Sequence, residues 1–161
     1  MINRKRKGAN AEREISELFR WLFGCELVRN LDQPRSGGSD LVVVNVDRSS
    51  SHYVKILQGF SIEIKRYARV SRSQSKEFWL QAYNQAKNEN RWPMLIIRED
   101  FRNPIFYIPL AYLGITAEIT PTPCDCLLLD VVGLASLFDH YQETQRYDKR
   151  KPWPQESAND I

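Results

Sequence analysis

One short segment constrains the fold more than any other part of the sequence. It reads Phe60-Ser61-Ile62-Glu63-Ile64-Lys65, and its large apolar residues predict a buried strand. Side chains on a strand alternate between the two faces of the sheet. We therefore expect Glu63 and Lys65 to share one face, while Ile62 and Ile64 point into the core.

A second strand is predicted at 41–46, which is rich in β-branched residues. Asp40 stands at its start, directly after the glycine-rich turn 37–39. Two acids and a lysine on adjoining strands can hold a divalent cation and aim a water molecule at a phosphodiester. Mg²⁺ prefers oxygen ligands, so Asp40, Glu63 and a backbone carbonyl near Ile64 would form a suitable set. An acid-x-lysine pair is also common on solvated faces, but the apolar neighbours of this pair favour a buried site.

The ordered residues Glu12, Asp40, Glu63 and Lys65 resemble the motif of the PD-(D/E)xK nuclease superfamily. Within it, the chain is most similar to the archaeal Holliday-junction resolvases and to small phage or bacterial relatives. One departure is visible, because Ser39 stands where the motif has a proline. In such proteins the aspartate binds the metal and the proline does not, so the serine at position 39 removes no metal ligand from the motif.

This resemblance spans roughly residues 6 to 108 and implies an α/β fold. The expected restriction-endonuclease-like core is a mixed β-sheet flanked by helices, in the order αβββαβ. The implied activity is a DNA endonuclease that hydrolyses phosphodiester bonds with Mg²⁺, for which Mn²⁺ can substitute, and that selects branched DNA in recombination or repair. A junction needs two symmetric incisions, which implies a homodimer. The alternatives are a restriction-like or repair nuclease on duplex or single-stranded DNA, and a non-catalytic DNA-binding module.

The resemblance also implies roles for two residues on predicted helices. Apolar residues at helical spacing predict the first helix over about 10–23, ended by Gly24. Relatives use a glutamate here as an additional metal or water ligand, which is the role implied for Glu12, although its spacing fits a solvated first-turn acid equally well. A polar residue on the helix predicted over about 74–88 reaches the metal-bound water or the phosphate in relatives. Gln81 is the candidate here, with an ordinary surface amide as the alternative.

Candidate phosphate contacts lie next to this site. The net charge is only +3, from 23 basic and 20 acidic residues, so binding of a polyanion depends on where the charge lies. Arg35 and Ser36 adjoin paired glycines, which let backbone N–H groups approach an anion. Arg66, Arg69 and Arg72 follow the strand with the acid-x-lysine pair. We expect these five residues to contact phosphate, whereas the basic runs at both ends fit solvated tails equally well.

The rest of the chain adds further elements to the core. Residues 52–57 are expected to form an added strand, and 93–98 and 104–108 the next two strands. The apolar stretch 127–138 predicts a strand leading into a short helix, and it fits core packing and a dimer interface equally well.

Length and composition suit one nuclease-like domain over residues 1–141, with a C-terminal extension from about 109 and a polar, flexible tail over 142–161. No apolar run approaches the roughly 20 residues that span a bilayer, so no membrane contact is expected. Three cysteines are an odd number, and no signal peptide is evident. We therefore expect the cytoplasm of a bacterial, archaeal or phage-infected cell.

Overall fold

The computed structural model describes residues 4–30, 38–44, 52–144 and 153 of the 161-residue chain. Within these residues the elements follow in the order α1 (Arg4–Phe23), β1 (Glu26–Arg29), β2 (Leu41–Val44), α3 (His52–Gln58), β3 (Phe60–Tyr67), α4 (Arg72–Glu89), β4 (Trp92–Glu99), β5 (Ile105–Pro109), the 3₁₀ helices η1 (Leu110–Leu113) and η2 (Pro123–Asp125), β6 (Cys126–Leu129) and α5 (Val131–Thr144).

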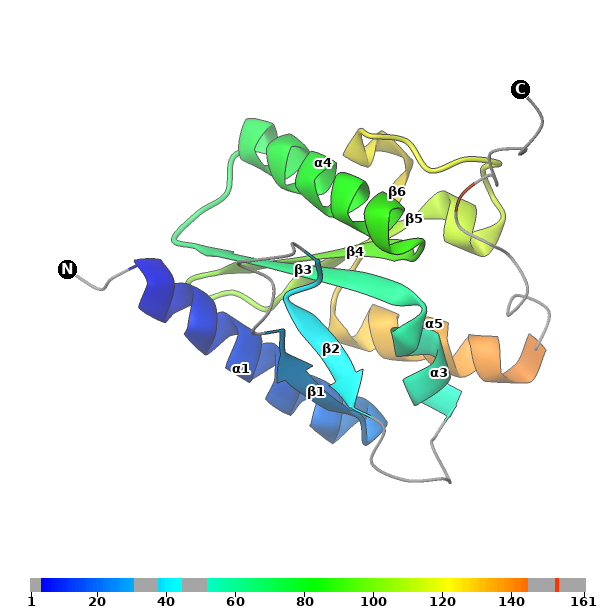
Figure 1. Ribbon diagram of the computed structural model, residues 1–161, viewed down its shortest axis with the longest axis horizontal. Helices are drawn as coiled ribbons and strands as arrows, with labels where there is room; N and C mark the ends of the chain where they lie inside the picture. Colours follow the sequence, from blue (N-terminus) through cyan, green and yellow to red (C-terminus); the bar gives the residue numbers. More distant parts are fainter. Residues whose placement is uncertain (1–3, 31–37, 45–51, 145–152, 154–161) are drawn as a thin grey trace, which may run out of the picture.

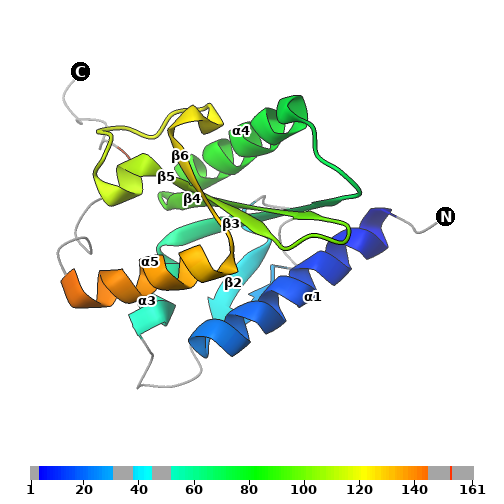
Figure 2. The ribbon, with the colours of Figure 1, turned by 180° about the vertical axis from the view of Figure 1, so that it is seen from behind.

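The described strands form one sheet in the order β1-β2-β3-β4-β5-β6. Strands β3 and β4 run parallel, and the other neighbouring strands run antiparallel. Helix α4 covers one face of the sheet, while α1, α3 and α5 cover the other (Figures 1 and 2). This arrangement confirms the predicted α/β fold with a mixed sheet flanked by helices, and it is compatible with a restriction-endonuclease-like core.

Strand β3 shows why the two faces of the sheet differ. Ile62 and Ile64 pack in the core that α1, α3 and α5 cover. On the opposite face, Leu95 of the neighbouring strand β4 packs in a separate apolar cluster under α4. Yet Ser61 and Glu63 of β3 are also buried, with 0% and 1% of their surface exposed. Burial of polar groups is costly unless they are hydrogen-bonded, so the buried polar side chains between β3 and α4 indicate a candidate functional site.

The ends of α1 and α4 are fixed by local sequence. Gly24 ends α1 as predicted, with a φ of 63° that glycine adopts without strain. Helix α4 begins with a capping box, in which Ser71 Oγ accepts from Gln74 N and the Gln74 side chain accepts from Ser71 N. At its other end Asn90 adopts a left-handed φ of 53°. These caps set the length of the helix that lies over β3.

The expectation of an added strand at 52–57 is wrong. This segment is helix α3, and its Val54 and Leu57 are buried in the core shared with α1 and α5. Residues three apart lie on one side of a helix, so this spacing buries both. A short apolar run does not by itself distinguish a strand from a buried helix. The predicted order αβββαβ therefore gains a helix between β2 and β3.

The strand and helix predicted from 127–138 are confirmed as β6 and α5. Leu134 and Phe138 are fully buried in the core, while Leu128 and Val132 remain 53% and 72% exposed. Of the predicted tail 142–161, residues 145–152 and 154–161 lie outside the described part. Among the described helices, none combines the length and the apolar character that crossing a membrane requires.

Candidate active site

Asp40 and Glu63 lie on adjoining segments of the chain, at the junction of β2 and β3. These strands pair antiparallel with Leu41 opposite Ile62, so Asp40, directly before Leu41, lies beside the part of β3 that carries Glu63. Two hydrogen bonds hold Asp40 there: its N–H donates to Ile62 O at 2.8 Å, and its Oδ2 accepts from Ile64 N at 2.6 Å. Both carboxylates are buried, Asp40 at 9% and Glu63 at 1% exposure.

Glu63 is held from one side by Lys65 and Gln81. Lys65 Nζ lies 2.5 Å from Glu63 Oε1, as expected for alternate residues on one face of a strand. Gln81 Nε2, from α4, donates to the same oxygen at 2.9 Å. The ammonium group of Lys65 also lies 5.6 Å from the centre of the Phe78 ring, a cation–π contact. Both donors thus engage Oε1, and Glu63 Oε2 is buried without a hydrogen-bond partner among the described residues.

The burial of Glu63 changes its acidity. Desolvation and the negative charge of Asp40 raise the pKa of Glu63 to about 7, against the lowering effect of Lys65. Glu12 contributes a smaller repulsion in the same direction. The carboxylates therefore repel one another in a region poor in water, and a bound cation would relieve that repulsion.

Glu12 belongs to this electrostatic group, although a different residue holds it. Its carboxylate is ion-paired with Arg29, at the end of β1. Burial raises the pKa of Glu12, Arg29 opposes this, and the charge of Asp40 adds to the increase. Glu12 thus lies on the side of α1 that faces the two strand carboxylates, rather than in open solvent.

The donor chemistry of these residues fits a hard divalent cation. Carboxylate oxygens are the ligands that Mg²⁺ and Mn²⁺ prefer, and Glu63 Oε2 is a buried oxygen that lacks a donor within the described chain. In the structure, the carboxylate of Glu12 is ion-paired with Arg29, and that of Glu63 is ion-paired with Lys65. Accordingly, the described residues contain no group of three or more His, Cys, Asp or Glu side chains already arranged around a metal position.

A second polar cluster, not anticipated from the sequence, adjoins Asp40. Ser39 N donates to Glu89 Oε1 at 2.5 Å, and Ser39 Oγ donates to Glu89 Oε2 at 2.7 Å. Ser39 Oγ also lies 3.1 Å from Ser61 Oγ, which accepts from Gln85 Nε2 at 3.1 Å. A proline at position 39 has no N–H to donate. Ser39, which replaces the proline of the motif, therefore donates a backbone hydrogen bond to Glu89 that proline could not make.

Gly38 completes this cluster. Its φ is 111°, and a Cβ at this position would lie 2.8 Å from Glu89 Oε1. The glycine turn was expected to bring the backbone close to an anion, and at Gly38 and Ser39 that anion is the carboxylate of Glu89. Beside it opens a cleft of about 570 Å³, whose lining is polar at most positions: Asn30, Gly38, Ser39, Val42, Gln85, Asn88, Glu89 and Arg91.

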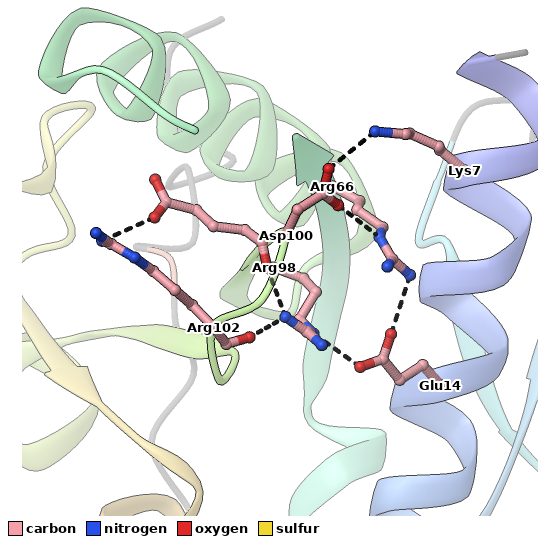
Figure 3. Close-up of polar contacts among 7 residues, drawn as sticks. Lys7, Glu14, Arg66, Arg98, Asp100 and Arg102 are labelled. Atoms are coloured by element: carbon pink, nitrogen blue, oxygen red, sulfur yellow. Dashed lines mark hydrogen bonds and ion pairs between the residues drawn. The ribbon is translucent and has the colours of Figure 1, made fainter. Parts of the chain in front are cut away.

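The five expected phosphate contacts fall into three groups. Arg35 and Ser36 lie outside the described residues. Arg66 is held within the protein by Glu14 and Asp100, at 3.0 and 3.4 Å (Figure 3). Arg69 and Arg72 are exposed and form no ion pair within the described part of the chain.

A family model described as "Phage putative PDDEXK endonuclease" matches residues 3–121. No curated protein matches significantly. The matched region contains strands β1 to β5 and helices α1, α3 and α4, and with them Asp40, Glu63 and Lys65. The chain therefore belongs to this phage PDDEXK endonuclease family, within the PD-(D/E)xK nuclease superfamily.

Proposed function

We propose that the protein is a metal-dependent DNA endonuclease whose catalytic centre is formed by Asp40, Glu63 and Lys65. The observation that carries this proposal is the state of Glu63, a carboxylate at 1% exposure whose Oε2 lacks a donor in the described residues. An ionised carboxylate buried next to a second one is unfavourable unless a proton or a bound cation neutralises part of the charge, and a divalent cation can neutralise both groups at once. Membership in an endonuclease family supports the same conclusion.

Asp40, Glu63, the backbone carbonyl of Ile64 and Glu12 would hold Mg²⁺, or Mn²⁺ in its place. When bound, such an ion stabilises charge on a phosphate and lowers the pKa of a bound water. The chain's own residues prepare the site in other ways. Lys65 places a positive charge 2.5 Å from Glu63, where it can orient a water and offset negative charge that develops on the phosphate. Gln81 fixes the orientation of the Glu63 carboxylate from α4.

We infer that the substrate is DNA, and we put branched DNA such as a four-way junction first. Arg35, Ser36, Arg69 and Arg72 would contact its phosphates, whereas Arg66, also expected to do so, is ion-paired with Glu14 and Asp100. Symmetric cutting of a junction would require a homodimer. Duplex or single-stranded DNA is the alternative substrate, and the place of action would be the cytoplasm of a phage-infected cell.

A cleavage assay on a set of labelled DNAs tests the proposal. A four-way junction, a flap, a duplex and a single strand are incubated with the full chain in Mg²⁺, in Mn²⁺ or in EDTA. We expect cutting of at least one DNA in the metal ions and none in EDTA. Asp40→Asn should bind DNA but lose cutting, while the control Asp125→Asn, in η2, should cut like the wild type.

The same assay separates the competing functions. Preferred cutting of the junction would support a resolvase, and preferred cutting of the duplex or the single strand would support a restriction-like or repair nuclease. Binding without cutting by the wild type in either metal ion would contradict the proposal and favour a non-catalytic DNA-binding module.

A further inference from the structure

The turn between β4 and β5 presents an aromatic side chain in an unusual conformation. Arg102 N donates to Glu99 O at 3.3 Å, which closes a four-residue turn with Phe101 at its third position. Phe101 has a φ of 62° and is 104% exposed. Glycine and asparagine are the residues that favour a positive φ at this point of a turn. A bulky aromatic residue here is strained and buries none of its surface.

The Phe101 ring gains no packing contact within the described protein that would offset this strain. The ring of Phe101 forms no aromatic contact with the described residues. Residues held in strained backbone conformations cluster at functional sites, where the surrounding structure enforces them. An exposed aromatic side chain that is conformationally strained therefore suggests an external ligand for the ring.

The base of the turn is held firmly by charged contacts (Figure 3). Asp100 N donates to Tyr67 O at 3.0 Å, and Asp100 is ion-paired with Lys7 of α1 at 2.9 Å and with Arg66 of β3 at 3.4 Å. Arg102 is ion-paired with Glu99 at 2.9 Å. The turn is thus anchored to two other elements, and Phe101 extends from a rigid base.

Arg98 and Glu14 extend this anchor towards the centre of α1. Glu14 accepts from Arg98 Nε at 2.7 Å and from Arg66 Nη1 at 3.0 Å. Arg66 and Arg98 are direct neighbours in the register of β3 and β4, so their like charges would repel without the carboxylate between them.

The turn lies near both the proposed catalytic centre and unpaired positive charge. Tyr67, to which the turn is bonded, is two residues beyond Lys65, or roughly 7 Å along the strand. Val70 N donates to Glu99 Oε1 at 2.7 Å, which brings the segment with Arg69 and Arg72 against the same turn. Since these two arginines lack ion pairs in the described chain, the surroundings of Phe101 favour a polyanion with flat, apolar groups.

We propose that Phe101 stacks on a nucleobase of the DNA substrate, on a base that is unpaired or only partly stacked, as at a branch point or a strand end. This inference rests on the proposed function, because it takes the bound polyanion to be DNA. Every base presents a π-face, so stacking on an aromatic side chain tolerates many sequences. The ring would hold the strand at the end of β3 while the neighbouring arginines contact its phosphates.

Binding of the full chain to fluorescein-labelled DNA in EDTA tests this inference by fluorescence anisotropy. Asn tolerates the backbone conformation of Phe101 and lacks the ring, whereas Tyr keeps the ring. We expect Phe101→Asn to bind a single strand or a branched DNA at least about fivefold more weakly. Phe101→Tyr should bind like the wild type. The control Trp21→Ala removes another exposed aromatic residue, about 20 Å along α1 from Lys7, and should change nothing.

A scan with abasic sites sharpens the test. An abasic site at the stacked position should weaken binding of the wild type about as much as Phe101→Asn does, and should add no further loss in that variant. Equal binding by Phe101→Asn and the wild type would overturn the inference. The inference would also be overturned if Phe101→Asn altered the oligomeric state of the protein without altering its DNA binding, because the ring would then contact a second copy of the chain. If the wild type instead neither binds nor cuts any of the DNAs, it is the proposed function that fails.

Discussion

Gln81 donates a hydrogen bond of 2.9 Å to Glu63, which joins helix α4 to the buried carboxylate of β3. Lys65 engages the same oxygen of Glu63, so the two donors fix the orientation of the carboxylate. We predict that Gln81→Ala lowers kcat for DNA cleavage about 10- to 100-fold, the usual effect of removing a residue that orients a metal ligand. The variant also loses a hydrogen bond to a buried carboxylate, so the free energy of unfolding should fall by about 1 to 2 kcal/mol.

Gln85 is a matched control for Gln81, because it lies one helical turn away and donates to Ser61 rather than to Glu63. Gln85→Ala should retain most of the cleavage rate. Equal kcat values for the two variants would show that the bond from Gln81 to Glu63 has no part in catalysis.

The pKa of Glu63 predicts a pH-dependent stability. Burial, together with the charge of Asp40, raises this pKa from 4.5 to about 7 in the folded protein. Between these values the folded chain binds a proton that the unfolded chain has released. The contribution of Glu63 to stability is therefore greatest below the unfolded pKa, and it is lost as pH rises through the folded pKa.

Glu63→Gln removes this dependence, because the amide stays neutral. The free energy of unfolding of the metal-free protein is measured in urea with EDTA. As pH rises from about 4 to about 8, this free energy should fall in the wild type relative to Glu63→Gln, by up to about 3 kcal/mol. The exposed acid Glu77 of α4 is the control, and Glu77→Gln should follow the wild type at both values. Parallel pH profiles for Glu63→Gln and the wild type would contradict the burial effect.

Ser39 offers a test of why this chain departs from the motif proline. Ser39→Pro would remove both the N–H and the hydroxyl that donate to Glu89, whose side chain is only 20% exposed. We expect a loss of about 2 kcal/mol or more in the free energy of unfolding, since hydrogen bonds to charged groups are involved. Ser39→Ala keeps the N–H and should lose less. Equal stability of the two variants in urea would mean that the N–H bond is not needed.

The strain at Phe101 predicts a stability change opposite in sign to its effect on binding. Phe101→Asn should raise the free energy of unfolding by about 1 kcal/mol, because asparagine tolerates a positive φ better than phenylalanine. Thermal unfolding of the full chain measures this. A lower melting temperature than that of the wild type would show that the turn is not strained by this residue.

Much of the fold could be predicted because its signals are local. Alternation in the segment 60–65 predicts the shared face of Glu63 and Lys65, and the β-branched segment after Asp40 predicts its partner strand. Segment 52–57 was predicted wrongly because its apolar residues fit both periods, and only packing against α1 and α5 selects the helix.

The rest depends on contacts between distant residues. Arg66 is held by Glu14 and Asp100, 52 and 34 residues away, so its sequence neighbours gave no indication that it would be ion-paired. The bond from Ser39 to Glu89 spans 50 residues. Position 101 carries phenylalanine and not glycine, the residue that usually indicates a positive φ, so the sequence did not predict the backbone conformation of this turn.

Binding of Mn²⁺ to the full chain, measured by calorimetry, tests the central claim most directly, namely that Asp40 and Glu63 together hold one divalent ion. We predict that the wild type binds Mn²⁺ and that Asp40→Asn and Glu63→Gln each lose this binding. An absence of Mn²⁺ binding in the wild type, or wild-type affinity in either variant, would contradict the account.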